Sequence, residues 1–309
     1  MKIAILGAGG IGGYLTAKLT LAGHPVALVA RGAHLAAMQA GGLKLVEPDG
    51  AHVVRPAVLT QDVADIGTPD VVVVTVKGQQ LADALDQIAP AVGPETMVMT
   101  VQNGVDAPEI AAAAFGAERV AICVARIFSN ITGPGEVTRY GPMRSFTIGA
   151  SDGRQNAPRV ARLREVLASA GVVAPDCADV RVDLWTKFML FNAVSSTTAA
   201  ARTRVGVVRD TPALAALARR LIRETYEVGR ASGIALPDGA PEAVWNYIAT
   251  QMPDEARAST AHDLENGAAL EIDTICGSVA RRGRALGVDV TASETVYALL
   301  APYRAGHPA

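Results

Sequence analysis

The chain has 309 residues, and its 28 Lys and Arg side chains nearly balance 30 Asp and Glu, giving a formal charge of −2. Half of the residues are hydrophobic, which is the usual proportion in a soluble globular protein. This charge argues against a nucleic-acid-binding protein, which needs an excess of Lys and Arg to neutralise phosphates. The length predicts about two domains, because a single core seldom grows past roughly 250 residues.

Neither the cysteines nor the apolar runs indicate a secreted or membrane protein. Cys123, Cys177 and Cys276 form no C-x-x-C pair, which argues against a disulfide scaffold or a structural zinc site. The chain starts directly with the strand-like KIAIL and shows no signal-peptide pattern. The apolar runs, such as the one at 71–74, are far shorter than the roughly 20 residues that span a bilayer. We therefore expect a cytoplasmic protein with no metal ion, no membrane contact and no nucleic-acid partner.

The first half of the chain alternates β-branched runs with helical patterns, which predicts βαβ units and a parallel sheet. The expected strands are 2–6, 25–30, 70–76, 96–101 and 120–126. The expected helices are 11–22, 33–39, 80–88 and 107–115. Turn signals at Gly133-Pro134-Gly135 and Gly141-Pro142 predict antiparallel extended segments over 131–150, at an edge of the sheet. Apolar residues three and four apart over 160–170 predict one more helix.

Beyond about Asp179 the strand signal nearly disappears, and apolar residues recur at helical spacing, as at Leu214, Leu217 and Leu221. The predicted fold class is therefore α/β, with an N-terminal Rossmann-type dinucleotide-binding domain followed by an all-helical C-terminal domain. We place the first domain at 1–178 and the second at 179–309. The apolar helical half is compatible with a homodimer.

The most informative motif is GAGGIG, a G-x-G-x-x-G that follows a predicted strand and opens a predicted helix. This position supports a dinucleotide-binding turn, whereas the pattern alone would also fit a glycine turn without a ligand. The first glycine permits the tight turn, the second lets the backbone approach a pyrophosphate, and the third allows close helix–strand packing. The candidate cofactor-binding residues of this motif are Gly7, Ala8, Gly9, Gly10, Ile11 and Gly12.

Three further candidates follow predicted strands, where ligands of open α/β sheets collect. An NAD-binding domain has Asp or Glu after its second strand to bind the ribose hydroxyls, but here that position is Arg31. A guanidinium would pair with a 2′-phosphate and favours NADP, while a solvated loop arginine is the alternative. Lys77 fits either a ligand contact or a surface lysine. Asn103 fits either a hydrogen bond near the nicotinamide or an ordinary Asn-Gly turn.

In order and spacing these motifs resemble the ketopantoate reductase (2-dehydropantoate 2-reductase) family, nearly end to end. The resemblance rests on the GAGGIGG opening, Arg31, the VTVK that ends at Lys77, QNG at 102–104, WTKF at 185–188 and STAHDLENGAALEIDTICG at 259–277. It implies an oxidoreductase that reduces the ketone of a 2-oxo acid with NADPH. Ketopantoate reduction, a step of pantothenate biosynthesis, is the leading expectation for this chain.

The resemblance also implies roles for single residues. Lys187 matches the family's lysine, which as a general acid protonates the alkoxide formed by hydride addition. Glu271 and Ser259 match groups that hold the polar ends of the substrate, and Glu271 can also orient the lysine. Asn103 and Glu271 are expected at both the substrate and the cofactor. We expect the Asn266-Gly267 pair to break a helix and bring Glu271 into the first turn of the next one, where the helix dipole favours a carboxylate.

Three departures from the family pattern bear on the substrate. The family commonly has asparagines four and eight residues after the lysine, where this chain has Phe191 and Ser195, and many members have an asparagine at the position of Ala256. Asn192 is rotated about 140° from Lys187 on a helix with about 100° per residue, so it does not simply replace the missing amide. Asn192 and Ser195 are nevertheless the candidate substrate-binding groups on this helix.

Other polar groups and other functions stay open at this point. Arg202 is a hypothetical clamp for the substrate carboxylate, with a solvated helix-end arginine as the alternative. His262 is close in sequence to Ser259 but is typical of a helix-surface residue. The altered positions leave room for another branched or aromatic 2-oxo acid as substrate. A non-catalytic NADP sensor is a third reading, which the presence of Lys187, Asn103 and Glu271 together disfavours.

Overall fold

The computed structural model describes residues 1–153 and 157–307, which form two compact units. Unit 1 comprises Met1–Gln102 and Ala107–Val180, and unit 2 comprises Asn103–Asp106 and Arg181–Ala309. The predicted division at residue 178 is close to the observed end of unit 1 at Val180. No sequence pattern indicates that the short segment Asn103–Asp106 belongs to unit 2.

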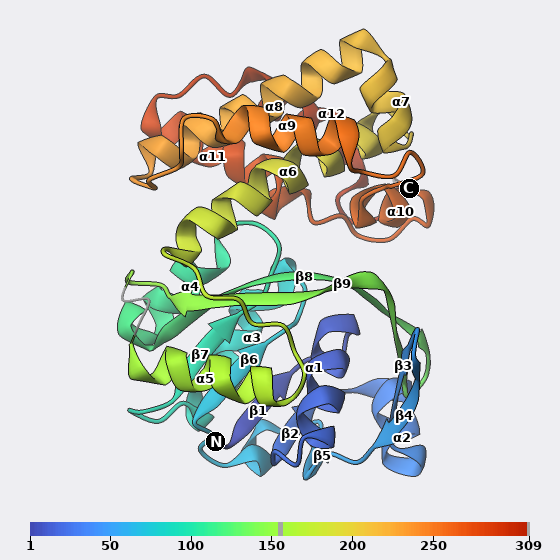
Figure 1. Ribbon diagram of the computed structural model, residues 1–309, viewed down its shortest axis with the longest axis vertical. Coiled ribbons are helices and arrows are strands. Elements are labelled where there is room, and N and C mark those ends of the chain that lie inside the picture. The colour runs from blue at the N-terminus through green and yellow to red at the C-terminus, as the bar shows by residue number, and fades with distance from the viewer. Residues whose placement is uncertain (154–156, 308–309) are drawn as a thin grey trace. The chain divides into compact units, whose positions relative to one another are not determined.

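Unit 1 is built on a mixed sheet whose parallel part is the predicted βαβ core (Figure 1). Within the described residues the sheet has nine strands, in the order β4-β3-β9-β8-β7-β6-β1-β2-β5. The parallel core strands are β5 (Val58–Thr60), β2 (Val26–Val29), β1 (Ile3–Leu6), β6 (Val71–Val74) and β7 (Met97–Thr100). The sequence predicts all of them except β5, which is a three-residue edge strand.

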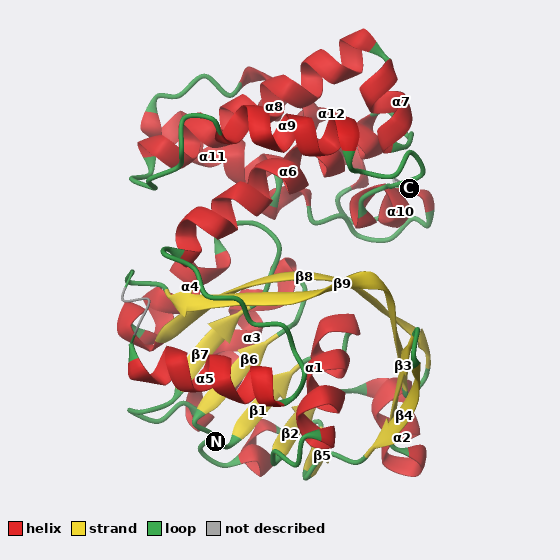
Figure 2. Ribbon diagram, in the orientation of Figure 1, coloured by secondary structure: helices red, strands yellow, loops and turns green. Residues whose placement is uncertain are grey.

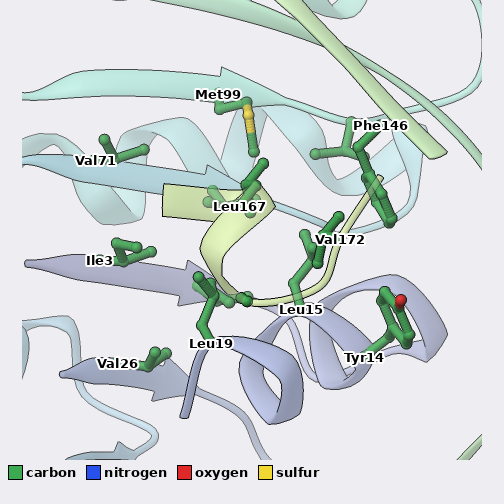
Figure 3. Packing of buried hydrophobic residues seen from close by; sticks show 14 of the residues in the cluster. Ile3, Tyr14, Leu15, Leu19, Val26, Val71, Met99, Phe146, Leu167 and Val172 are labelled. Atoms are coloured by element: carbon green, nitrogen blue, oxygen red, sulfur yellow. The ribbon is translucent and has the colours of Figure 1, made fainter. Parts of the chain in front are cut away.

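Helices cover both faces of this sheet because the side chains of successive strand residues point to opposite faces. On one face Ile3 and Val71 lie in a cluster with Leu15 of α1 and Leu167 of α5 (Figure 3). On the other face the alternate strand residues lie in a cluster with side chains of α3 and α4. The helices of unit 1 are α1 (Gly10–Leu21), α2 (Gly32–Gly41), α3 (Leu81–Ile88), α4 (Ala107–Phe115) and α5 (Pro158–Ser169). Short 3-10 turns lie at Val63–Ile66, Gly78–Gln80, Ala89–Ala91 and Ala117–Arg119.

A long hairpin extends the sheet beyond its parallel core. Strand β8 (Val120–Gly133) starts parallel to β7 and returns as the antiparallel β9 (Glu136–Ala150). The predicted antiparallel pair and its turn after Gly133 are therefore present. The second predicted turn is not, because Gly141-Pro142 lies inside β9, at a shift in the register of the pair. The prediction that the pair forms the sheet edge is also wrong. The reason is that β3 (Leu43–Glu47) pairs parallel with β9, and β4 (Gly50–Val54) then forms the edge.

The described part of unit 2 contains helices and loops but no strand, which confirms the predicted helical second half (Figure 2). Its α-helices are α6 (Val180–Ala200), α7 (Val205–Asp210), α8 (Pro212–Ala231), α9 (Ala240–Thr250), α10 (Ser259–Glu265), α11 (Cys276–Leu286) and α12 (Thr291–Leu300). Two 3-10 turns lie at Ile272–Thr274 and Ala301–Tyr303. None of the helices in 1–153 and 157–307 is long and apolar enough to cross a membrane.

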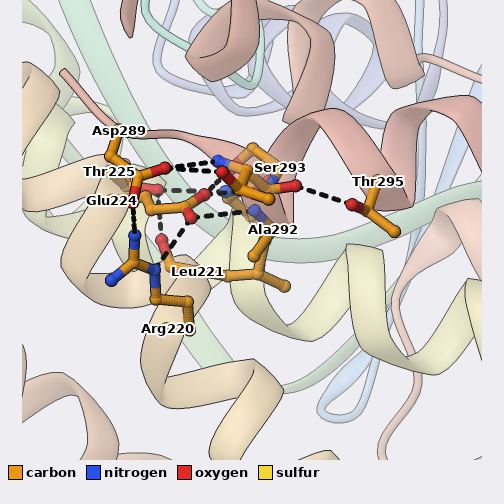
Figure 4. A network of polar contacts seen from close by, with 10 residues as sticks. Arg220, Leu221, Glu224, Thr225, Asp289, Ala292, Ser293 and Thr295 are labelled. Carbon is orange, nitrogen blue, oxygen red and sulfur yellow. Dashed lines mark hydrogen bonds and ion pairs between the residues drawn. The ribbon is translucent and has the colours of Figure 1, made fainter.

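A fully buried carboxylate ties α8 to the start of α12 (Figure 4). Glu224 of α8 is 0% exposed and accepts hydrogen bonds from the backbone N–H groups of Ala292 and Ser293, at 2.9 and 2.8 Å. The Ser293 hydroxyl donates to it at 2.7 Å, and Arg220 Nε donates at 3.0 Å. The carboxylate thus satisfies first-turn N–H groups of α12, which have no acceptor within their own helix.

Candidate active site

The glycine-rich turn joins β1 to α1 and has the backbone geometry that its sequence predicts. Gly7 has φ +104°, a conformation that side chains other than hydrogen rarely allow. A Cβ at Gly12 would lie 1.9 Å from the carbonyl oxygen of Gly7 and 2.4 Å from Thr75 Oγ1, so only glycine fits there. A Cβ at Gly9 would meet nothing within 4 Å, so the backbone is open to an approaching group at this residue.

A pocket of about 290 Å³ lies beside this turn in unit 1. Gly7, Ala8 and Gly9 line it, together with Arg31 and Lys77, whereas Gly10, Ile11 and Gly12 do not.

Charge distinguishes the pocket lining. Arg31 stands at the N-cap of α2, and Lys77 stands where the chain leaves β6, so two cations face the pocket. Among the described residues that line it there is no Asp or Glu. The open backbone at Gly9 and this positive lining fit the phosphates of a dinucleotide.

A buried glutamine fixes the carboxyl end of the neighbouring strand β7. Gln102 Nε2 donates to the carbonyl oxygens of Val74 and Val76 at 2.8 and 3.0 Å, and Gln102 Oε1 accepts from the N–H of Val101 at 3.1 Å. The side chain therefore holds the ends of β6 and β7 together. In the sequence Gln102 stands out only as part of the QNG motif. Its position directly after a predicted strand is the signal that it holds strand ends together.

In unit 2 the predicted catalytic lysine contacts the predicted asparagine. Lys187 of α6 is half-buried, and its Nζ donates to Asn103 Oδ1 at 3.0 Å, although the two residues are 84 positions apart. Asn103–Asp106 belongs to unit 2, so this contact lies within one unit. A lysine ammonium has three hydrogens, so Lys187 can donate to Asn103 and to a substrate oxygen at once.

The Asn103–Asp106 segment is itself held by α11 and by the turn before it. Gly104 has φ +92°, and a Cβ there would lie 2.5 Å from the carbonyl oxygen of Thr274. Asp106 Oδ1 accepts from Ser278 Oγ at 2.7 Å and from Arg282 Nε at 2.8 Å, and Asp106 Oδ2 accepts from Arg281 Nη2 at 3.2 Å. Asp106 therefore fixes the segment that carries Asn103, and no motif in the sequence indicates this role for Asp106.

Glu271 belongs to the same turn, but not in the predicted position. Helix α10 ends at Glu265 and is followed by Asn266 and by Gly267 with φ +64°, so the predicted helix break is present. Glu271 precedes the single 3-10 turn Ile272–Thr274, and α11 begins only at Cys276. The expectation that Glu271 lies in the first turn of a helix is therefore wrong, and the helix dipole does not account for it. The N–H and Oγ1 of Thr274 donate to the Glu271 carbonyl oxygen, so Glu271 is linked to the residue that Gly104 packs against.

Comparison with known proteins identifies the family. Residues 3–153 match the family model for ketopantoate reductase PanE/ApbA, and residues 179–304 match the model for its C-terminal part. The chain belongs to the ketopantoate reductase family. It is 34% identical to a 2-dehydropantoate 2-reductase of Mesorhizobium japonicum, over 97% of each chain. The family resemblance predicted from the sequence is thus confirmed.

Solved structures support the same assignment. A PanE/ApbA family ketopantoate reductase from Ralstonia eutropha JMP134 superposes with a TM-score of 0.89 at 32% identity, covering 98% of each chain. A D-mandelate dehydrogenase with NADH and anilino(oxo)acetate superposes with a TM-score of 0.87 over 98% of each chain, but at 20% identity it shows the shared fold alone. The predicted α/β fold with a helical C-terminal part is therefore confirmed as that of ketopantoate reductases.

The two substrate-binding candidates of α6 differ in what their side chains contact. Asn192 is 0% exposed, its Nδ2 donates to Thr225 Oγ1 at 3.0 Å, and its Oδ1 accepts from Ser196 Oγ at 3.1 Å. Both ends of its amide are therefore used in packing α6 against α8, and we do not retain Asn192 as a substrate ligand. Ser195 is 1% exposed, and its Oγ has no hydrogen-bond partner among the described residues, which leaves it available to a ligand.

The remaining polar candidates lie nearer the surface. Ser259 is the exposed first residue of α10, and His262 is exposed one turn later. Arg202 is exposed, has φ +49°, and donates from Nη2 to the Tyr303 hydroxyl at 3.4 Å, with its guanidinium 5.6 Å from the ring centre. This contact is consistent with the surface alternative for Arg202, and we do not assign it a substrate role.

The first residue of α11 yields a test of the packing near Glu271. Burial raises the pKa of the Cys276 thiol from 9.0 to about 11, and its Sγ contacts the Ile272 carbonyl oxygen at 3.7 Å. Because the thiolate is the reactive form, iodoacetamide at pH 8 should label the half-buried Cys177 in the native protein and spare Cys276 and the buried Cys123. Peptide mass spectrometry measures the labelling, with urea-unfolded protein as the control in which all three react.

The stabilisation from protonated Cys276 should be lost as pH rises from about 9 through 11.

Proposed function

We propose that this protein reduces 2-dehydropantoate (ketopantoate) to pantoate with NADPH. The observation that carries the proposal is the bond from Lys187 Nζ to Asn103 Oδ1, at 3.0 Å, in a chain that matches the family over both of its parts. A proton donor held by a fixed acceptor is what ketone reduction requires and what a binding protein does not need. We infer that the enzyme works in the cytoplasm, in pantothenate biosynthesis, and that its partner is a small-molecule 2-oxo acid and not a nucleic acid or a membrane.

Lys187 has the central chemical role in this proposal. NADPH, when bound, supplies the hydride that adds to the keto carbon. Lys187 transfers a proton from Nζ to the substrate oxygen as negative charge develops there, which is general acid catalysis. Asn103 Oδ1 accepts a hydrogen bond from one N–H of the ammonium and so directs another N–H toward the substrate. Glu271, Ser259 and the unpartnered hydroxyl of Ser195 are the groups that we assign to the polar ends of the substrate.

Arg31 carries the proposed preference for NADPH over NADH. It lines the pocket together with Lys77, and no carboxylate in the described lining could accept bonds from an unphosphorylated ribose. Arg31→Ala should raise the Kd for NADPH roughly ten- to hundredfold, because a charged hydrogen bond contributes about 1.5–3 kcal/mol. Fluorescence titration with both cofactors measures this, and the Kd for NADH should stay within about twofold. Arg55→Ala, an exposed arginine outside the pocket lining, is the control. Equal weakening of both cofactors would contradict the assignment.

The reaction is tested by following deuterium from the cofactor to the product. With NADPH deuterated at both C4 positions, mass spectrometry of the product should find pantoate with one deuterium at C2. Pantoate without deuterium, or no pantoate at all, would contradict hydride reduction of ketopantoate.

A second substrate is favoured by one specific set of residues. Phe191, Ser195 and Ala256 replace amides that are common in the family, so the site offers fewer polar contacts to a hydroxylated substrate. Another branched or aromatic 2-oxo acid is therefore the alternative substrate on the same scaffold. Kinetic comparison of such acids with ketopantoate separates the two.

A further inference from the structure

We propose that His34 recognises the 2′-phosphate of the cofactor together with Arg31, an inference that rests on the proposed use of NADPH. No motif in the sequence indicates a function for this histidine. His34 lies in the first turn of α2, three residues after the N-cap residue Arg31. Side chains at these two positions of a helix start lie next to each other, and both residues line the pocket of unit 1.

The hydrogen bonding of His34 determines where its ring carries a proton. The N–H of Gly135, in the turn between β8 and β9, donates to His34 Nδ1 at 3.0 Å. An accepting Nδ1 has no proton, so the neutral ring carries its hydrogen on Nε2. The ring therefore presents a donor at Nε2.

This donor lacks an acceptor within the described part of the chain. His34 Nε2 is buried and has no hydrogen-bond partner among those residues. A buried polar group without a partner is unfavourable, so in a native protein it calls for an acceptor from outside the described residues. The ring cannot easily turn away, because the hairpin turn holds Nδ1 and packs tightly on α2. A Cβ at Gly135 would lie 3.2 Å from the Cβ of Ala37.

The chemistry of the pocket identifies the missing acceptor. Arg31 and Lys77 supply positive charge, and the described lining contains no Asp or Glu that could accept from Nε2. An anion with several acceptor oxygens satisfies both the guanidinium of Arg31 and the N–H of His34. Because Arg31 already stands at the ribose position of a dinucleotide fold, that anion is the phosphate monoester on the 2′ oxygen.

Two substitutions separate the donor from the structural bond. His34→Asn keeps an acceptor for the Gly135 N–H but removes the donor at Nε2. His34→Gln restores a donor near the position of Nε2. His52→Asn is the matched control, because His52 is an exposed histidine of β4 outside the pocket lining. Calorimetric titration with 2′,5′-ADP and with 5′-AMP reads out the 2′-phosphate contribution without any turnover, and thermal melting checks the fold of each variant.

We expect His34→Asn to weaken 2′,5′-ADP binding roughly tenfold or more and 5′-AMP binding less than twofold, with most of the loss restored in His34→Gln. Equal weakening of both nucleotides, or of neither, would overturn the proposal, as would a failure of His34→Gln to bind better than His34→Asn. The wild-type protein separates this failure from that of the proposed function. If it binds 2′,5′-ADP no more tightly than 5′-AMP, then the NADPH preference itself is wrong.

Discussion

Replacing Lys187 by alanine should lower kcat for ketopantoate reduction roughly 10²- to 10⁴-fold, which is the usual contribution of a general acid. The Kd for NADPH should stay unchanged, because the cofactor pocket of unit 1 contains no atom of Lys187. The physical reason is that the substrate oxygen gains negative charge as hydride adds, and Lys187 is the cation that protonates it. Stopped-flow measurement of NADPH oxidation at saturating substrate reports the chemical step, and cofactor fluorescence reports binding.

The controls for Lys187 use its partner and an unrelated lysine. Asn103→Ala should lower kcat less than Lys187→Ala does, and the double variant should be no slower than Lys187→Ala alone, because both residues act through the same ammonium. Lys2→Ala removes an exposed lysine of unit 1 and should leave kcat unchanged. A Lys187→Ala variant that keeps more than about a tenth of the wild-type kcat would show that another group donates the proton.

Replacing Glu224 by alanine should lower the free energy of unfolding by about 3–5 kcal/mol. The change leaves the N–H groups of Ala292 and Ser293 without their acceptor, and the buried Ser293 hydroxyl loses its acceptor as well. Arg220 adds less to the cost, because its side chain is 41% exposed and can be hydrated. Urea unfolding followed by far-UV circular dichroism measures the effect on the helical unit.

The conservative variant separates charge from hydrogen bonding at this position. Glu224→Gln keeps one acceptor oxygen and should cost about half as much as the alanine variant. Glu242→Ala, an exposed acid at the start of α9, is the matched control and should change stability by less than about 0.5 kcal/mol. A Glu224→Ala protein as stable as this control would mean that the network of Figure 4 contributes little to folding.

Most of the fold could be predicted, because long periodic segments define it. The helix predicted at 107–115 agrees with α4 at Ala107–Phe115, and the predicted core strands differ from the observed ones by at most two residues at either end. The missed strands β3, β4 and β5 are three to five residues long, and β4 is largely exposed. Such short strands show too little alternation to be distinguished from loops, and only their pairing partners stabilise them.

The site was predictable where a local pattern implies a local geometry. The glycine turn follows from the spacing of the motif. Its first glycine, Gly7, permits the tight turn, and its third, Gly12, allows the close packing of helix and strand. The bond between Lys187 and Asn103 does not follow in the same way, because it depends on the assignment of the four-residue segment 103–106 to unit 2. Asn192 shows the same limit, since its partner Thr225 lies on a different helix. His34 was missed because its tautomer depends on Gly135, 101 residues away.

The central claim is that this chain reduces ketopantoate with NADPH. The most direct test is steady-state NADPH oxidation with ketopantoate and with a panel of branched and aromatic 2-oxo acids. The same measurements are repeated with NADH. We predict that kcat/KM is highest for ketopantoate with NADPH. A higher kcat/KM for an aromatic or another branched acid would contradict the assigned substrate, and tight NADPH binding without turnover of any 2-oxo acid would contradict the assignment of an enzyme.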